Sequence, residues 1–220
     1  MQLPWNAIET VLLDMDGTLL DLHFDNHFWR EHVPLRFAER HGLQVEVAKE
    51  HLFPRFHSME GRMEWYCVDY WSRELGLDIA ELKREVDHLI AVHPHVLDFL
   101  DRVRGAGKRI VLVTNAHQKA LALKMQCTEL GGHFDALVCA HEHGRPKEDL
   151  SFWNWLREHE PFHPEHSLFI DDSLPVLRAA REYGVRHLLS IRQPDSKGPQ
   201  RDIDEFPAIR HFDEIFPDRS

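Results

Sequence analysis

The segment at residues 10–18 reads TVLLDMDGT. It begins with a short run of β-branched and aliphatic residues, which is typical of a buried strand in a parallel sheet. Asp14 and Asp16 follow at positions i and i+2, so their carboxylates can point toward the same face of an extended segment. Gly17 lets the backbone turn sharply, and N–H groups exposed at such a turn can contact a phosphate. The segment therefore predicts a strand that ends in a pair of acids.

Two other interpretations of this segment stay open when it is taken alone. A calcium loop of the EF-hand type also contains Asp-x-Asp and a glycine. Its glycine stands sixth and lies between helices, whereas Gly17 stands fourth and follows a strand. A plain turn after a strand would need no chemistry at all.

Apolar runs of the same kind recur along the chain and alternate with amphipathic stretches. The predicted strands are Thr10–Asp14, Arg109–Thr114, Ala136–Cys139, Ser167–Ile170 and His187–Ile191. The predicted helices among them are Val96–Arg104, His117–Leu130, Glu148–Glu158 and Leu174–Tyr183. This alternation predicts an α/β fold in which helices cover both faces of a parallel sheet.

The segment between the first strand and Val96 breaks this rhythm. It has no convincing strand and shows four helical patterns, at Asn26–His41, Val45–His57, Arg62–Leu75 and Ile79–Ala91. A structureless loop of this length is unusual in a compact domain, so we predict an inserted all-helical cap over the carboxyl edge of the sheet. The predicted division is a core of residues 1–20 and 94–220 and a cap of residues 21–93, with Pro94 at the return hinge. The polar tail after Gln193 is expected to wrap the core without taking part in chemistry.

Polar clusters follow the other predicted strands as well. Thr114 and Asn115 end the second strand, Lys147 follows the third, and Asp171 and Asp172 follow the fourth. Open parallel sheets bind ligands at the carboxyl ends of their strands, so we expect these clusters to converge. Adjacent carboxylates repel each other unless a cation lies between them, and Mg²⁺ prefers a few protein oxygens together with substrate phosphate and water. Alone, each cluster could be a turn, a helix cap or a solvated surface group; together they favour one site.

The composition restricts the possible partners. The net charge is −11 with histidine counted neutral, which argues against a nucleic-acid partner but not against a small anion held by local cations and a metal. Cys67, Cys127 and Cys139 are widely spaced and form no CxxC, which favours reduced thiols in a cytosolic protein. The first residues have neither a basic region nor a long apolar run. We therefore expect no signal peptide, no membrane span and a cytoplasmic location.

Histidine is abundant, with 18 residues, and two close pairs resemble metal ligands. These are His93 with His95 and His141 with His143. No third and fourth ligand stands at zinc-site spacing, so surface or loop roles are expected for them.

The motifs DMDGT, TN, PK and IDDS, in this order, resemble the signature of the haloacid dehalogenase-like (HAD) superfamily. The resemblance spans most of the chain. It implies a Rossmannoid core with a helical cap inserted between the first and second motifs. It also implies a Mg²⁺-dependent reaction through an aspartyl-phosphate.

The resemblance assigns roles to the matching positions. Asp14 would be the nucleophile and a Mg²⁺ ligand, and Asp16 would be the general acid–base and offer its backbone carbonyl to the metal. The implied phosphate-binding residues are Thr114, Asn115 and Lys147. The remaining implied metal ligands are Asp171 and Asp172. An acid at position 16 favours phosphatase or phosphomutase chemistry, because dehalogenases of this fold lack it.

Longer stretches, among them LLDMDGTLLDLHFDNHFWREHVP and WYCVDYWSRELGLDI, look like the bacterial purine 5′-nucleotidases of this superfamily that act on GMP and IMP. A purine base needs a flat aromatic surface, and the predicted cap offers Phe24, Phe28, Trp29, Trp65, Tyr66, Tyr70 and Trp71. We expect only one or two of these to face the substrate and the others to pack between helices. Three residues after the first motif are candidate specificity contacts: His23, Asp25 and Asn26.

Other activities stay possible at this point. A phosphatase of sugar phosphates or phosphoglycolate, a phosphomutase, and a binding protein that keeps the fold without catalysis would all fit parts of the pattern. A phosphonatase would need a Schiff-base lysine in the cap. The two cap lysines, Lys49 and Lys83, lie on amphipathic stretches and are expected on solvated faces.

Overall fold

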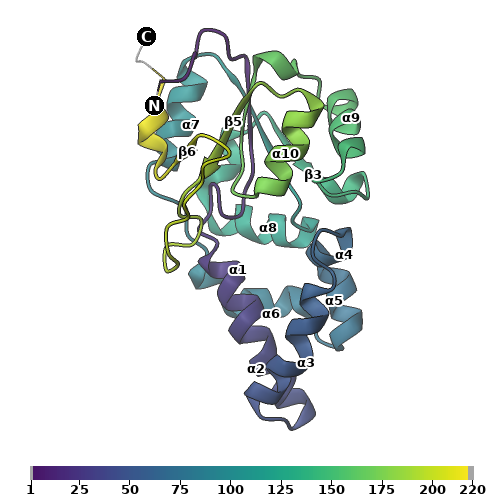
Figure 1. Ribbon diagram of the computed structural model, residues 1–220. Coiled ribbons are helices and arrows are strands. Elements are labelled where there is room, and N and C mark those ends of the chain that lie inside the picture. Colours follow the sequence, from purple (N-terminus) through teal and green to yellow (C-terminus); the bar gives the residue numbers. More distant parts are fainter. Residues whose placement is uncertain (1, 218–220) are drawn as a thin grey trace.

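The computed structural model describes residues 2–217 and contains a six-stranded sheet (Figure 1). The strand order is β3-β2-β1-β4-β5-β6, and every neighbouring pair runs parallel. The strands are β1 (Thr10–Leu13), β2 (Arg109–Thr114), β3 (Ala136–Cys139), β4 (Ser167–Ile170), β5 (His187–Ile191) and β6 (Ala208–Ile209). The predicted parallel α/β sheet is confirmed.

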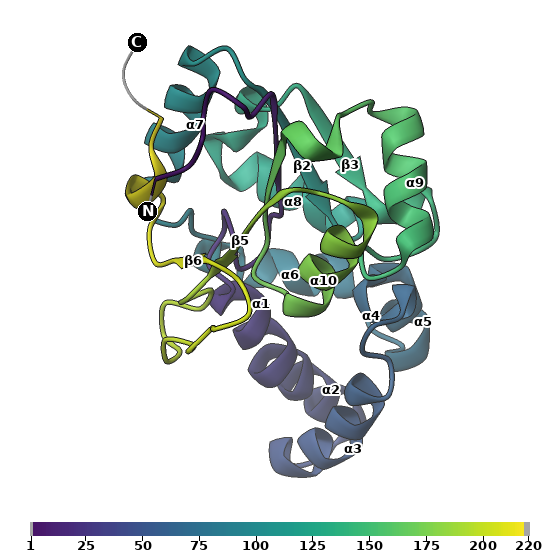
Figure 2. The same ribbon diagram turned by 45° about the horizontal axis from the view of Figure 1, so that its top comes forward.

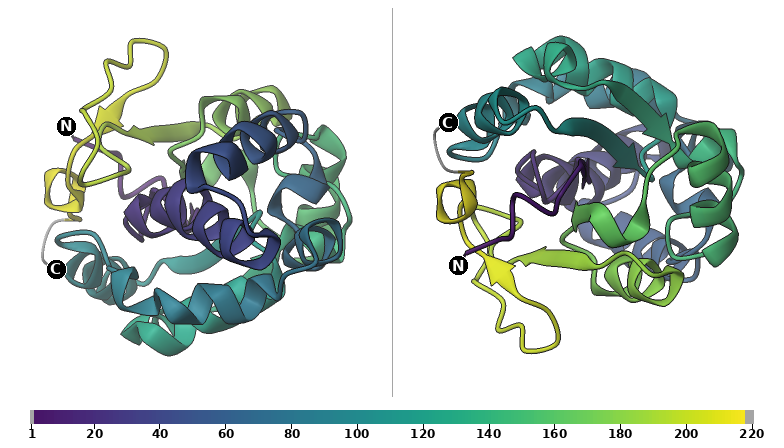
Figure 3. Two further views of the ribbon diagram at one scale, coloured as in Figure 1. Left: turned by 90° about the horizontal axis from the view of Figure 1, so that it is seen from below. Right: turned by 90° about the horizontal axis from the view of Figure 1, so that it is seen from above.

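Helices cover both faces of this sheet (Figures 2 and 3). They are α7 (Val96–Gly105) and α8 (Gln118–Cys127) on one face, and α9 (Leu150–His159) and α10 (Leu174–Tyr183) on the other. Successive side chains of a strand point to opposite faces, so Val11 and Leu13 join one apolar cluster and Leu12 joins the other. The strands are mostly apolar because both faces of the sheet are buried.

Between β1 and β2 the chain forms an all-helical insert, defined here as residues 23–89. Its α-helices are α1 (His23–His27), α2 (Val33–His41), α3 (Val45–His57), α4 (Met63–Tyr66), α5 (Val68–Leu75) and α6 (Ile79–Glu85). They enclose an apolar cluster of their own around Phe28, Leu52 and Trp71 and lie below the sheet in Figure 1. A bridge between Leu20 and Val92 joins the two ends of the insert. The domain division at residues 20 and 94 stays a prediction.

The first helical stretch of the insert begins at His23, before the predicted start at Asn26, and is not a regular α-helix throughout. A π-helical turn at Phe28–His32 separates α1 from α2. Pro34 follows directly in the first turn of α2. Because proline has no N–H and its ring crowds the carbonyl four residues earlier, the helix widens where it approaches this position.

The predicted helix at Arg62–Leu75 is instead two helices that meet at Cys67. The backbone of Cys67 is extended, with φ −86° and ψ 108°. Its Sγ accepts a hydrogen bond of 3.4 Å from the backbone N–H of Tyr70, which caps α5. The break places the Cys67 side chain within 4.8 Å of ligand atoms of His117 and His141 in the core.

The C-terminal tail does more than wrap the core. Ala208 and Ile209 pair in parallel with Ser190 and Ile191 and add the sixth strand, which the sequence analysis did not predict. Two residues are too few to show the alternation by which a strand is recognised. None of the helices within residues 2–217 combines the length and the apolar character needed to cross a membrane.

Strand register aligns the polar strand ends at one edge. Leu13 pairs with Leu112 on one side and with Ile170 on the other, so Asp14 and Asp171 leave the sheet side by side. Gly17 has a φ of +85°, and a Cβ at this position would lie 2.8 Å from the carboxylate carbon of Asp172. Only glycine therefore lets the loop after β1 turn this closely beneath the loop after β4.

Candidate active site

A cavity of about 550 Å³ opens at the carboxyl edge of the sheet, between the core and the helical insert. From the core, its lining includes the residues Asp14, Asp16, Thr114, Asn115, Lys147, Asp171 and Asp172. From the insert, its lining includes Asp25, Asn26, Trp29, Phe53, Phe56, Trp65 and Tyr66. Of the ten site residues predicted from the sequence, only His23 stands outside the lining that the described chain provides.

Lys147 is buried among acids at the centre of the sheet edge. Its Nζ lies 2.5 Å from Asp14 Oδ1 and 2.7 Å from Asp171 Oδ2, and it also donates to the carbonyl oxygen of Val113. Burial alone would lower the pKa of this ammonium, but Asp14 and Asp171 outweigh burial and raise it. Lys147 is therefore a fixed positive charge at this point of the cavity.

The ammonium of Lys147 and the guanidinium of Arg201, which lies 3.5 Å from Asp172 Oδ2, do not balance the three carboxylates that meet here. Burial raises the pKa of Asp14 to about 7, against the opposing effect of Lys147 and with a further contribution from Asp171. Burial and the neighbouring Asp14 raise the pKa of Asp172 to about 7. Burial also raises the pKa of Asp171 to about 6, although Lys147 opposes it. When all three acids are ionised, the site thus holds three negative charges against the two positive charges of Lys147 and Arg201.

The donor set of this cluster fits a hard divalent cation. Asp14, Asp171 and Asp172 each offer one carboxylate oxygen, and these oxygens lie within 4.8 Å of one another. Asp14 Oδ2 is buried and has no hydrogen-bond partner among residues 2–217. All-oxygen ligation by a few carboxylates is what Mg²⁺ prefers, and a divalent ion would supply the missing positive charge.

Asn115 holds the loop that carries Lys147. Its Oδ1 accepts from the backbone N–H of Lys147 at 2.9 Å, and its Nδ2 donates to Glu148 at 2.9 Å. Tyr66, from the helical insert, donates its hydroxyl to the other oxygen of Glu148 at 2.8 Å. The Asn115 side chain therefore positions Lys147 and Glu148. The hydrogen bond from Tyr66 to Glu148 links the insert to the core.

Asp16 belongs to a second buried charge network that sequence reasoning missed. Lys124, on α8, lies 2.6 Å from Asp16 Oδ1 and 2.6 Å from Asp25 Oδ2. Lys83, on α6, lies 2.9 Å from Asp25 Oδ1. Burial raises the pKa of Asp16 even though Lys124 opposes it. For Asp25, Lys124 and Lys83 outweigh the effect of burial and lower the pKa.

The expected solvated position of Lys83 is wrong. Its side chain is only 4% exposed, and its ammonium lies 4.3 Å from the ring centre of Phe28 and 4.9 Å from that of Phe24. The ammonium is stabilised by Asp25 and by the faces of these rings. Lys49, by contrast, pairs with Glu31 at the surface. An amphipathic pattern counts every lysine as polar and cannot separate the two.

We expect Asp25→Asn to lower the free energy of unfolding by about 3 kcal/mol, because it leaves Lys83 buried without its counter-ion. Adding Lys83→Met should recover part of this loss, with a coupling of about 1–3 kcal/mol measured by urea unfolding in a double-mutant cycle. The exposed pair Lys49 and Glu31 is the matched control, and its coupling should stay below about 1 kcal/mol. Additive effects of Asp25→Asn and Lys83→Met would contradict the network.

The tail reaches the same edge of the sheet. Arg201 donates to the carbonyl oxygens of Asp172 at 2.8 Å and of Ile191 at 2.9 Å. Asp195 accepts a 2.7 Å hydrogen bond from Asn26 and lies 3.6 Å from His23. The tail therefore holds the loop after β4 and the start of the insert. Nothing in a polar, turn-rich stretch signals such contacts in advance.

Three of the seven aromatic residues named from the sequence line the cavity. They are Trp29, Trp65 and Tyr66, and α3 adds Phe53 and Phe56. Phe24, Phe28 and Trp71 are fully buried in the apolar cluster of the insert. The insert thus presents an apolar, aromatic wall opposite the charged edge of the sheet.

Known proteins share sequence and fold with this chain. Residues 8–184 match the family model described as haloacid dehalogenase-like hydrolase. The chain is 37% identical over 217 residues to the GMP/IMP nucleotidase YrfG of Escherichia coli (strain K12), a match that covers 99% of this chain and 98% of that protein. It is 24% identical over 225 residues to a phosphoglycolate phosphatase of Pseudomonas putida, covering 94% and 80% of the two chains.

Among solved structures, a HAD phosphatase from Thermococcus onnurineus has a TM-score of 0.78 and 21% identity, and the match covers 94% of this chain and 95% of that one. This likeness concerns the fold. The family match covers most of the chain, and the sequence relationship spans nearly all of it. The chain therefore belongs to the haloacid dehalogenase-like hydrolases, as a phosphoric monoester hydrolase of that family.

Proposed function

We propose that the protein is a Mg²⁺-dependent phosphatase that hydrolyses purine nucleoside 5′-monophosphates, with GMP and IMP preferred, through an aspartyl-phosphate at Asp14. The observation that carries the reaction is the convergence of Asp14, Lys147, Asp171 and Asp172 at one buried sheet edge. The observation that carries the substrate class is the aromatic wall opposite that edge. The proposal also extends the name of the 37% identical relative to this chain.

In the first step, a carboxylate oxygen of Asp14 attacks phosphorus and the bond to the ribose 5′ oxygen breaks. Lys147 and the Thr114 hydroxyl hold oxygens of the transferring group, and the ammonium offsets the repulsion between a carboxylate and a dianion. Asp14, Asp171 and Asp172 would hold Mg²⁺, which when bound keeps Asp14 ionised and neutralises charge on the phosphoryl oxygens. The Thr114 hydroxyl already accepts the N–H of Ala116 at 3.0 Å, so its proton can be directed to the ligand.

Asp16 moves the protons in both steps. It protonates the departing alkoxide, and it then removes a proton from the water that hydrolyses the aspartyl-phosphate. Its raised pKa suits the first role, because a neutral carboxyl group must be available near neutral pH. Lys124 holds Asp16 Oδ1 in place, which leaves Oδ2 to carry the proton.

The aromatic wall supplies what a purine ring needs on the far side of the cavity. Trp29, Trp65 and Tyr66 provide flat apolar surface, and a stacked base is held with little directional bonding. Asp25 is charge-paired with two lysines, and Asn26 donates to Asp195. We assign Asp25 and Asn26 to shaping the cavity wall, while His23 lies outside the cavity lining and 3.6 Å from Asp195.

The test is phosphate release from GMP, IMP, AMP, UMP, several sugar phosphates and phosphoglycolate, each with Mg²⁺. Preference for GMP and IMP supports the whole proposal. Preference for phosphoglycolate or a sugar phosphate keeps the reaction and discards the purine assignment. Transfer of the phosphoryl group between sugar positions without release indicates a phosphomutase. A protein that binds these esters and turns over none of them is a binding protein.

We expect Trp65→Leu to raise KM for GMP by about 5- to 100-fold, the effect of losing one base-stacking partner, with little change in kcat. KM for phosphoglycolate, which has no base, should change much less. Trp65 is the better choice than Trp29, because Trp29 packs against Phe56 and Trp71 and its removal would disturb the insert. Steady-state kinetics on both substrates give the comparison.

The matched control for this variant is Trp155→Leu. Trp155 is also half-buried, but it lies on α9 and stacks on His143, outside the cavity lining. It should leave both KM values unchanged. An equal rise in KM for GMP and phosphoglycolate in Trp65→Leu would show a general effect on the cavity and remove Trp65 from base recognition.

We expect EDTA to abolish activity, and Mg²⁺ to raise the melting temperature more at about pH 8 than at about pH 5. The pKa values of Asp14, Asp171 and Asp172 are raised from 3.8 to about 7, 6 and 7. A raised carboxyl pKa favours the folded state most at low pH, and this contribution is lost as pH rises through about 6 to 7. At low pH, protons compete with the cation for these oxygens. Thermal melts with and without Mg²⁺ measure the difference.

The variant Asp172→Asn serves as the control for the metal prediction, since it removes one oxygen ligand and one of the three charges. Its Mg²⁺-dependent shift should shrink at high pH. A shift that is the same in both proteins at both pH values would contradict cation binding at this cluster.

A cytoplasmic location is part of the same proposal, because the three cysteines are free thiols.

A further inference from the structure

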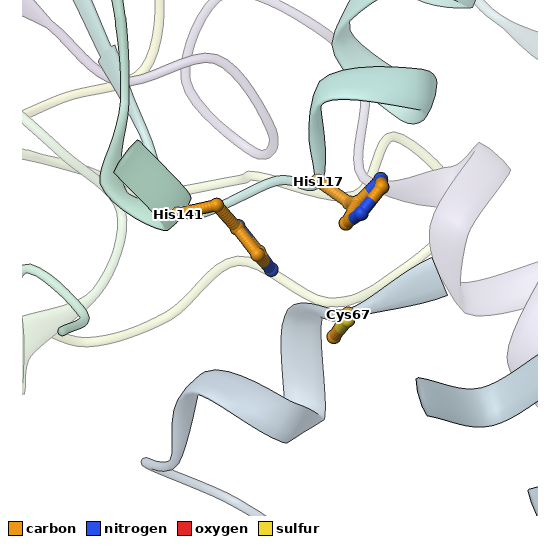
Figure 4. Close-up of side chains that lie close together, drawn as sticks. All are labelled: Cys67, His117 and His141. Carbon is orange, nitrogen blue, oxygen red and sulfur yellow. The ribbon is translucent and has the colours of Figure 1, made fainter. Parts of the chain in front are cut away.

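Three potential metal ligands meet outside the carboxylate cluster. Cys67 stands at the break between α4 and α5, His117 precedes α8, and His141 lies in the short turn after β3. Their ligand atoms all lie within 4.8 Å of one another. Figure 4 shows the three side chains facing a common space, with Cys67 approaching from the helical insert and both histidines from the core.

In the sequence, His141 and His143 stand close together, and no further ligand stands at zinc-site spacing. The structure separates these two, since His143 stacks on Trp155 and lies 3.1 Å from the hydroxyl of Ser151. His141 instead faces His117, with ring centres 4.9 Å apart. The three ligands are far apart along the chain, so no spacing motif could reveal them.

His141 has an unused, buried ligand atom. Its Nε2 has no hydrogen-bond partner among residues 2–217. A buried imidazole nitrogen without a partner is unfavourable, and a metal bond would satisfy it. Burial and the neighbouring His117 also lower the pKa of His141 to about 4, so the ring is neutral near pH 7, which is the form that binds metals.

The surroundings support ligation by the other two residues. His117 Nδ1 accepts a 3.2 Å hydrogen bond from the backbone N–H of Lys119, which fixes the ring and leaves Nε2 to bind a metal, and the carboxylate of Asp69 lies 3.6 Å from this Nε2. Cys67 Sγ faces the N-terminal end of α5, where helix N–H groups favour the thiolate. Typical zinc bonds of about 2.0–2.3 Å bring ligand atoms to within about 4 Å of one another, so any separation here between that and the 4.8 Å limit must shorten on binding. Cys67 lies at a helix break, where such an adjustment is easiest.

We propose that Cys67, His117 and His141 bind a zinc-class divalent ion that ties the helical insert to the core. One thiolate and two imidazoles form a borderline-to-soft donor set, which selects Zn²⁺ or Co²⁺ over Mg²⁺, and water completes a tetrahedral site. The carboxylate cluster, with oxygen ligands alone, has the opposite preference. The protein thus carries two metal sites of different chemistry.

Metal at this site joins elements on both sides of the cavity, since His117 is part of its lining. Such a bond restrains movement of the insert relative to the core. If the proposed phosphatase activity is correct, this restraint slows substrate exchange, and Zn²⁺ inhibits turnover without displacing Mg²⁺. The binding site itself does not depend on the proposed activity.

The test uses metal-free protein titrated with Co²⁺ in the presence of excess Mg²⁺, which occupies the carboxylate cluster. We expect one equivalent of Co²⁺ to produce the visible bands of a tetrahedral ion and a thiolate-to-cobalt charge-transfer band. Zn²⁺ should displace Co²⁺ and thereby remove both kinds of absorption band. Cys67→Ser should lose the charge-transfer band, and His141→Phe should weaken Co²⁺ binding by about 10-fold or more.

Cys127→Ser is the matched control, because Cys127 is an exposed free thiol. It should keep the wild-type spectrum. An octahedral spectrum in the wild type, or a charge-transfer band that survives in Cys67→Ser or disappears in Cys127→Ser, would overturn the proposal. Far-UV circular dichroism checks that the variants are folded, and Cys67→Ser retains an atom able to cap α5.

Inhibition separates the two metal sites. Zn²⁺ that acts through Cys67 should inhibit the wild type at least about 10-fold more strongly than Cys67→Ser at the same Mg²⁺ concentration. Equal inhibition of both proteins would show that Zn²⁺ acts at the carboxylate cluster. It would overturn the proposal that metal bound at Cys67 restrains the insert. A protein without phosphatase activity would still show the cobalt spectrum, so failure of the proposed function is distinguishable from failure of this site.

Discussion

Replacing Asp14 with Asn is expected to lower kcat by about 10⁴-fold or more, the scale seen when a covalent nucleophile is removed, while the fold stays intact. Asn has the size of Asp but cannot form the acyl phosphate. The substitution loses the ion pair with Lys147 but also relieves repulsion among the buried acids Asp14, Asp171 and Asp16. These effects oppose each other, so the melting temperature should change little.

The measurements for Asp14→Asn are phosphate release and intact-protein mass after an acid quench. The wild type should carry a phosphoryl group during turnover, and the variant should not. Asp101→Asn, at an exposed position, is the matched control and should behave as the wild type. If Asp14→Asn retains more than a few per cent of the wild-type activity after contamination is excluded, Asp14 is not the nucleophile.

The second large effect is expected at Lys147, where catalysis and stability should fall together. Lys147→Met keeps the length of the side chain but leaves Asp14 and Asp171 without their shared cation. Removing one partner from a buried ion pair costs about 3–5 kcal/mol, which corresponds to a loss of about 10 °C in melting temperature for a chain of this size. The lost charge should also lower kcat by about 10²–10³-fold or more.

Thermal melts and phosphate release measure the two effects of Lys147→Met. Lys197→Met, at an exposed position, should change neither. Because proton uptake by Asp14 or Asp171 can replace the missing charge, the instability of Lys147→Met should be smaller at low pH. A variant that is inactive but as stable as the wild type would show that the buried acids do not need Lys147.

The strands and the polar ends of the strands could be predicted from the sequence for one physical reason. A parallel sheet buries both faces, so its strands are mostly apolar runs, and clusters of polar residues mark the points where the strands leave the sheet. Asp14, Thr114 and Asp171 stand at such points. Their convergence follows from the parallel register, which brings all carboxyl ends to one edge.

The second charge network could not be predicted in this way. Lys83 and Lys124 lie on helices, where a buried lysine and a solvated one produce the same amphipathic pattern. Their burial depends on Asp25, which lies on a third helix, and helix–helix contact is not visible in local periodicity. The same limit applies to Cys67 and the two histidines, which the fold brings together from three separate elements.

The position of the helical insert has a consequence for the order in which the chain folds. β1 pairs with β2 and β4, and both of these strands are synthesised after the entire insert. A ribosome therefore releases Thr10–Leu13 long before any partner strand exists, and this apolar segment waits unpaired. The helices of the insert depend on contacts close in sequence and can form during that delay. The length of the insert thus sets how long β1 is exposed to aggregation and chaperones, and the aromatic wall of the cavity can form before the sheet that carries Asp14.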